Sequence, residues 1–331
     1  MNRDILNPKS ALTWTTLGTI MVALVGTSFA MGAEPRLGIL SLLAVLAVLG
    51  VTTAAIVVVI RVIDLYRTGG VLPLLLATAA GATIVPWVAR SANKNLLDAI
   101  AAAFGRRFSS MWAAAIAGPL TEEWLKGVCV LMVLLLMGAA SWRPVQGMLV
   151  GAASGLGFQV VEDILYALRS GQTSLISEFN GAVGTTAARS FFGPISHWLY
   201  SAIVGAGIAL ALGWLGTPAS SRSRRTLVLA VALMLTGTGV HALWNSPLEL
   251  TVGVWVVAVK FVLAIATFAA VVVWATTREG DHLEAHAARK GQELERWRAM
   301  RRRTRKVKGR SARRQERRRW RQEVQALQAT C

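Results

Sequence analysis

The chain has 331 residues, of which 54% are hydrophobic and only 16% charged, and its formal net charge is +18. Soluble globular domains carry about 25% charged residues, whereas several apolar runs here reach the roughly 20 residues that cross a bilayer as a helix. This composition excludes a soluble globular protein. Because the apolar runs are continuous rather than alternating, it also argues against membrane-spanning strands. We expect an all-α, polytopic membrane helix bundle.

Eight apolar segments are predicted to span the membrane. The first has an apolar run of nearly 20 residues, which fits an uncleaved span better than a signal peptide cleaved near Ala30. The sixth is longer than one span requires, so we expect it to be tilted or to begin as an interfacial turn. The predicted spans are 11–33, 37–60, 71–89, 110–137, 144–168, 183–214, 226–247 and 252–276.

Lys and Arg residues in short loops predict the orientation, because they favour the cytoplasmic side. The basic loop residues that agree place both termini in the cytoplasm of a cell-membrane protein; they are Arg3, Lys9, Arg61, Arg67, Arg143, Arg222, Arg224 and Arg225. The segment 91–108 and its flanks disagree, with Arg90, Lys94, Arg106 and Arg107 on the predicted outside. Either this segment is an interfacial amphipathic helix, or the third predicted span is wrong.

Three regions follow from these spans: N-terminal transmembrane helices (1–110), a core transmembrane domain (111–277) and a basic cytoplasmic tail (278–331). The tail holds 18 Lys and Arg against seven Asp and Glu. A basic juxtamembrane segment attracts anionic lipid by about 1 kcal/mol per residue near the surface. Nucleic acid is the less favoured partner, because no nucleic-acid-binding motif accompanies the charge. The excess of Arg over Lys fits a bacterial, high-GC origin.

The fourth span contains two adjacent carboxylates and an amine, Glu122, Glu123 and Lys126. Placing one charge at the bilayer centre costs roughly 2.5–3.5 kcal/mol. One interpretation is a buried Glu–Lys ion pair that fixes the helix register, since Glu122 and Lys126 lie four residues apart on one face. Two carboxylates and one amine nevertheless leave one carboxylate over, which favours a functional site.

Three later segments carry further polar groups. Phe158 and Glu162 lie four residues apart on one face of the fifth span, and Asp163 is expected to meet headgroup water there. His241 and Asn245 share a face of the seventh span. The third segment runs from Arg189 to His197 in the sixth span.

The predicted topology places four of these groups at a similar depth. Counted from the outer helix ends, Glu122 lies about 12 residues deep and Glu162 and His241 about six, while His197 lies about 14 residues into the sixth span. All four therefore fall between the midplane and the outer leaflet, and we expect them to meet in one hydrated pocket.

Two glutamates and two histidines in one pocket allow two kinds of chemistry. They can ligate a divalent metal, with zinc as the first candidate. Alternatively, a carboxylate can activate water as a general base while an imidazole donates to the developing oxyanion. The sequence has no HExxH motif, so the strongest zinc-protease signal is absent.

These four motifs, in this order, resemble the PrsW family of intramembrane proteases and, more remotely, the CAAX-protease and bacteriocin-processing superfamily. The matching residues are Pro119-x-x-Glu122-Glu123-x-x-Lys126, Gly157-Phe158 with Glu162 and Tyr166, Arg189 with His197, and His241-x-x-x-Asn245. Asp163 departs from the pattern, since an Asn is common there. The resemblance implies hydrolysis of peptide bonds in membrane-anchored proteins. It also implies catalytic roles for Glu122, Glu123, Glu162, His197 and His241.

The family is described as metalloproteases, although the wider superfamily includes members argued to use glutamate without metal. Our hypothesis is that Glu122 or Glu123 activates water and that His197 and His241 bind metal or the oxyanion. Glu162 would then be a third metal ligand or a proton shuttle. Lys126 would keep the glutamates ionised, with Phe158, Arg189 and Asn245 as supporting residues. The rival hypotheses are an ion-coupled transporter that uses the same groups and a catalytically silent membrane scaffold.

Overall fold

The computed structural model describes residues 5–64, 70–193 and 195–289, and within these it contains helices and no strand. The predicted all-α membrane bundle is therefore confirmed. The long helices are α1 (Ala11–Gly32), α2 (Ile39–Ile63), α3 (Val71–Phe104), α4 (Arg106–Met137), α5 (Pro144–Thr173), α6 (Glu178–Phe192), α7 (His197–Leu215), α8 (Arg224–Asn245) and α10 (Trp255–Arg289). Short helices are η1 (Ala139–Ser141), η2 (Ala219–Ser221) and α9 (Leu248–Val252).

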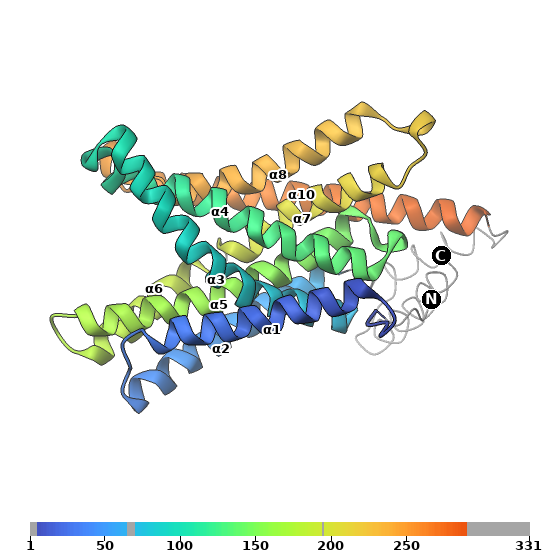
Figure 1. The fold of residues 1–331 in the computed structure, drawn as a ribbon. Helices are drawn as coiled ribbons and strands as arrows, with labels where there is room; N and C mark the ends of the chain where they lie inside the picture. Colours follow the sequence, from blue (N-terminus) through green and yellow to red (C-terminus); the bar gives the residue numbers. More distant parts are fainter. Residues whose placement is uncertain (1–4, 65–69, 194, 290–331) are drawn as a thin grey trace, which may run out of the picture.

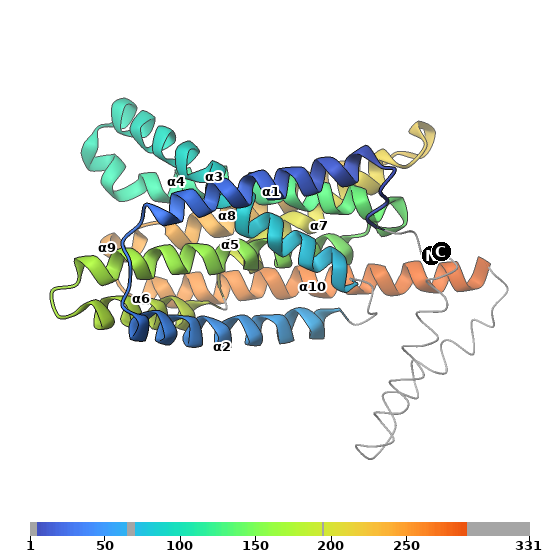
Figure 2. The same cartoon turned by 60° about the horizontal axis from the view of Figure 1, so that its bottom comes forward.

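Seven of the described helices are long and apolar enough to cross a membrane: α1, α2, α3, α5, α7, α8 and α10. The chain is therefore a multi-pass membrane protein. Helix α4 has the length to span, but it carries Glu122, Glu123 and Lys126 in its middle. Its crossing of the membrane stays a prediction. The long helices run roughly parallel or antiparallel to one another, with α6 and α7 following in the same direction, and α1 begins at the end of the bundle where α10 ends (Figures 1 and 2).

The prediction of one sixth span over 183–214 is wrong. This segment forms two helices, because α6 ends at Phe192 and α7 begins at His197. His197 is therefore the first residue of a helix rather than a residue in mid-helix. Non-helical backbone at membrane depth needs partners inside the protein. The indole of Trp198 donates to the carbonyl of Gly193 (3.0 Å), and the hydroxyl of Tyr200 donates to that of Ile195 (3.2 Å).

The difficult segment 91–108 is largely a continuation of α3, which runs unbroken through Pro86 to Phe104. Gly105, with a φ of +83°, makes the turn into α4. The C-terminal part of α3 and the N-terminal part of α4 form a hairpin that leans away from the bundle (Figures 1 and 2). We call this hairpin the α3–α4 arm (residues 91–117). A small apolar cluster around Ile100 and Ala113 holds its two helices together. The four basic residues that do not fit the predicted orientation thus lie on or next to this arm: Arg90, Lys94, Arg106 and Arg107.

Helices α5 and α7 form the centre of the bundle, and a row of glycines lets them touch. A Cβ atom added at Gly151 would lie 2.1 Å from the carbonyl oxygen of Ser201, and one at Gly155 would lie 2.3 Å from that of His197. Small residues at such positions allow membrane helices to approach closely. Gly151 and Gly155, four residues apart on one face of α5, serve this purpose here. The contact also fixes the position of the first turn of α7, where His197 lies.

We predict that Gly151→Ala destabilises the protein by about 1–3 kcal/mol, because the added methyl group has to push α5 and α7 apart. Gly50→Ala is the matched control: a Cβ atom at this α2 position meets nothing within 4 Å. Thermal unfolding in detergent should show a lower midpoint for Gly151→Ala and an unchanged or higher midpoint for Gly50→Ala. Equal midpoints would contradict the close packing of α5 on α7.

Candidate active site

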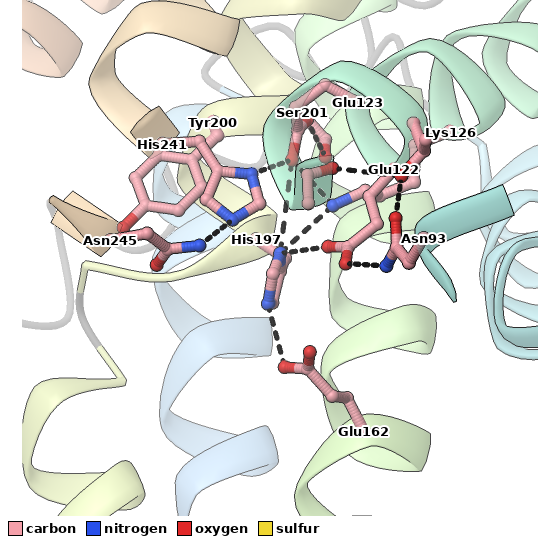
Figure 3. Close-up of polar contacts among 12 residues, drawn as sticks. Asn93, Glu122, Glu123, Lys126, Glu162, His197, Tyr200, Ser201, His241 and Asn245 are labelled. Carbon is pink, nitrogen blue, oxygen red and sulfur yellow. Dashed lines mark hydrogen bonds and ion pairs between the residues drawn. The ribbon is translucent and has the colours of Figure 1, made fainter. Parts of the chain in front are cut away.

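A cavity of about 630 Å³ lies within the bundle, walled by side chains from α1 and from α3 to α8. Glu122, Glu162, His197 and His241 all line it. The structure thus brings together the four groups that the sequence placed at one depth, and Figure 3 shows them converging from α4, α5, α7 and α8. The wider wall carries apolar residues such as Met31 and Leu97.

The Glu123 carboxylate is the most heavily bonded group of the site. Its Oε1 atom lies 2.6 Å from Lys126 Nζ and 3.0 Å from His241 Nδ1, while Oε2 accepts from the Ser201 hydroxyl at 2.8 Å. Glu123 and Lys126 are both fully buried. A buried charge with this many partners is held in one orientation, so Glu123 ties α4 to both α7 and α8.

His197 lies between an amine and a carboxylate. Its Nδ1 atom is 3.0 Å from Lys126 Nζ, and its Nε2 atom is 2.9 Å from Glu162 Oε2. An ammonium can only donate and a carboxylate can only accept, so these neighbours assign the proton to Nε2 and the lone pair to Nδ1. The edge of the Phe158 ring packs against the imidazole with 4.7 Å between ring centres.

His241 is arranged in the same way. Its Nδ1 atom donates to Glu123, and its Nε2 atom lies 3.2 Å from the amide nitrogen of Asn245, one helical turn further along α8. The Tyr200 ring stacks on the imidazole with 4.8 Å between ring centres and 15° between planes. Both histidines therefore give one N–H to a carboxylate and turn a lone pair toward the remaining groups.

Glu122 differs from the other acids of the described site because one of its oxygens is buried without a hydrogen-bond partner. Its Oε1 atom accepts a hydrogen bond from the Asn93 amide at 3.0 Å. Its Oε2 atom is buried and has no hydrogen-bond partner among the side chains that the structure describes. The Nδ1 atom of His197 lies 3.8 Å from this oxygen. An unpartnered buried oxygen costs about 1–3 kcal/mol, which marks Glu122 as the group with spare capacity.

Glu162 is held by Arg189 of α6 in addition to His197. The guanidinium lies 2.5 Å from Glu162 Oε2 and also contacts the carboxylate of Asp163. It rests on the Tyr166 ring at 4.0 Å. The expectation that Asp163 meets headgroup water is wrong, because its side chain is buried and paired with Arg189.

Glu122, His197 and His241 can together hold a metal ion, because one ligand atom from each lies within 4.8 Å of the others. Catalytic zinc sites take three protein ligands of this type. Histidines that bind metal almost always donate their second ring N–H to a carboxylate or carbonyl, as both do here. The residues thus fit a divalent cation. In this group Glu122 replaces Glu162, the ligand that the sequence suggested.

Three residues of the site were not predicted from the sequence: Asn93 and Ser201, which bond to the glutamates, and Thr121, which contacts Asn93. Ser201 lies four residues after His197 on the same face of α7, so the helical period could have revealed it. Asn93 lies beyond the predicted end of the third span. Only a continuous α3 brings it to the site.

We predict that Lys126→Met lowers stability by about 3–5 kcal/mol, because it leaves the buried Glu123 carboxylate without its cation. The double variant Glu123→Gln/Lys126→Met should recover much of this loss, since no unpaired charge remains. Thermal or denaturant unfolding in detergent measures both. A single variant as stable as the wild type would contradict the buried ion pair.

Comparison with known proteins agrees with this site. A family model described as the PrsW family intramembrane metalloprotease matches residues 70–275, a range that contains the glutamates, both histidines, Arg189 and Asn245. No curated protein and no solved structure matches the chain. Because the family match covers more than half of the sequence, this chain belongs to the PrsW family of intramembrane metalloproteases.

Proposed function

We propose that this protein is an intramembrane endopeptidase that uses the Glu122, His197 and His241 group to hydrolyse peptide bonds of membrane-anchored proteins. The observation that carries the proposal is the free Oε2 atom of Glu122, buried beside two imidazoles whose orientation is fixed. The cavity of about 630 Å³ offers room for a short extended segment of substrate next to these groups. A transport function has no comparable supporting observation.

In the metal-free form of the proposed reaction, Glu122 takes a proton from water as the water oxygen attacks the scissile carbonyl carbon. The proton then passes to the leaving nitrogen as the C–N bond breaks. The developing oxyanion needs a donor nearby, and Lys126 Nζ, 3.0 Å from His197 Nδ1, is a cation beside this site. Glu123 and Glu162 act by holding His241 and His197 in place, and Glu162 can also accept a proton from His197.

A divalent metal, with zinc as the first candidate, would be held by Glu122, His197 and His241. When bound, it supplies Lewis-acid polarisation of the carbonyl and activates water. Lys126 lies against the lone pair of His197, so a cation at this nitrogen takes over the contact that the lysine makes in the structure. The metal-free route, with Glu122 as the sole base, is the alternative that the metal experiment below decides.

The remaining assignments extend the proposal to the whole chain. We propose a cell-membrane location with both termini in the cytoplasm, a membrane-anchored protein as substrate, and a catalytic core over 111–277 preceded by helices over 1–110. Of the basic tail (278–331), residues 290–331 lie outside the described part of the structure. Its attraction to anionic lipid stays a prediction from charge alone.

Glu122→Gln and His197→Ala should each lower cleavage of a co-expressed membrane-anchored substrate by at least about 100-fold, because each removes a group that contacts the reacting atoms. Asp281→Asn is the matched control, since this exposed acid lies on α10 away from the cavity. The measurement is the ratio of cleaved to intact substrate on immunoblots, normalised to enzyme accumulation. Undiminished cleavage in both variants would refute the protease assignment.

Metal dependence is tested on detergent-purified protein. We expect about one zinc ion per chain by elemental analysis and less in Glu122→Gln and His241→Ala, which lose a ligand. Glu162→Gln should bind zinc roughly 10–100-fold more weakly, because it removes the carboxylate that orients His197. If chelation removes all metal while cleavage continues at the wild-type rate, the metal-free route is correct.

A further inference from the structure

The Glu122 carboxylate uses its two oxygens differently, and a residue from another helix causes this difference. Oε1 is bonded to Asn93 Nδ2 at 3.0 Å, while Oε2 has no hydrogen-bond partner among the described residues (Figure 3). Asn93 belongs to α3, at the point where the α3–α4 arm begins. Without this amide, the carboxylate could rotate about its last side-chain bond.

The orientation of the Asn93 amide follows from its neighbours. A carboxylate accepts and does not donate, so the amide nitrogen faces Glu122 and the amide oxygen faces away. That oxygen contacts the hydroxyl of Thr121, which is also 2.9 Å from the carbonyl oxygen of Ala117 in its own helix. Thr121 and Glu122 are adjacent on α4, so Asn93 is bonded to α4 through both of its polar atoms.

We propose that Asn93 is a positioning residue for Glu122, holding Oε1 so that Oε2 stays directed at His197 and the reacting water or metal. This inference rests on the proposed proteolytic function. Thr121 supports it by occupying the amide oxygen. Asn93 itself needs no contact with substrate, and its effect reaches the reaction through Glu122.

A residue that merely fills space would behave differently from a positioning residue. Asn93→Asp keeps the size and shape of the side chain but replaces the donor with a second carboxylate, and two carboxylates sharing a site cannot readily both ionise. Asn93→Ala leaves a small gap that water can fill as a donor to Glu122. Positioning therefore predicts that the isosteric change is the more harmful one. If Asn93 only fills space, Asn93→Ala should lose more activity than Asn93→Asp.

The test compares wild type, Asn93→Ala and Asn93→Asp in proteoliposomes that contain a substrate cleaved by the wild type. We expect kcat to fall roughly 10–100-fold in Asn93→Ala and further in Asn93→Asp, with KM changed less than threefold in both. Thermal midpoints of the same preparations show that the variants are folded. Zinc affinity, measured by competition with a chelator, should fall in Asn93→Ala if the metal route holds.

Thr121 provides an internal control. Thr121→Val should lower kcat in the wild-type background but cause no further loss in Asn93→Ala, where the amide is absent. Thr121→Ser keeps the hydroxyl, so its kcat should equal that of the wild type.

The inference is overturned if Asn93→Asp is as active as Asn93→Ala or more active, while the wild type cleaves normally. A wild type that neither cleaves a membrane substrate nor binds zinc overturns the proposed function instead. The wild-type control therefore separates the two failures.

Discussion

Every charge placed inside this bundle must find a partner there, because the lipid around it offers none. The Glu123 and Lys126 pair shows how this constraint shapes the site. Two fully buried ions attract a hydroxyl from α7 and imidazoles from α7 and α8, so that satisfying one ion pair brings three helices together. In the proposed site, this network sets the positions of both histidines, while Oε2 of Glu122 stays buried without a hydrogen-bond partner among the described residues.

The arrangement divides the acids of the site into two kinds. Glu123 and Glu162 each contact a cation and an imidazole, and they hold other side chains in place. Glu122 accepts a hydrogen bond from the neutral amide of Asn93, and its Oε2 atom is buried without a partner among the described residues. Sequence alone cannot make this distinction, because Glu122 and Glu123 are identical neighbours in the same apolar segment. The direction in which each one points on α4 decides it.

Much of the fold and the membership of the site could be predicted from the sequence, and the failures have physical causes. Ionisable residues in apolar segments identified Glu122, Glu162, His197 and His241, because such residues are costly unless they meet. The break before His197 was missed, since hydropathy cannot distinguish one long span from two helices joined inside the protein. Asn93 was missed because the third span was ended where its apolar run stops, whereas α3 continues.

The hairpin formed by the outer halves of α3 and α4 adds a mechanical aspect to this site. Asn93 lies at its base, so any displacement of the hairpin relative to the bundle would shift the amide that touches Glu122. A hydrogen bond is lost over displacements of less than an ångström beyond its normal length. A substrate chain that pressed on the hairpin would therefore change the position of the Glu122 carboxylate through Asn93.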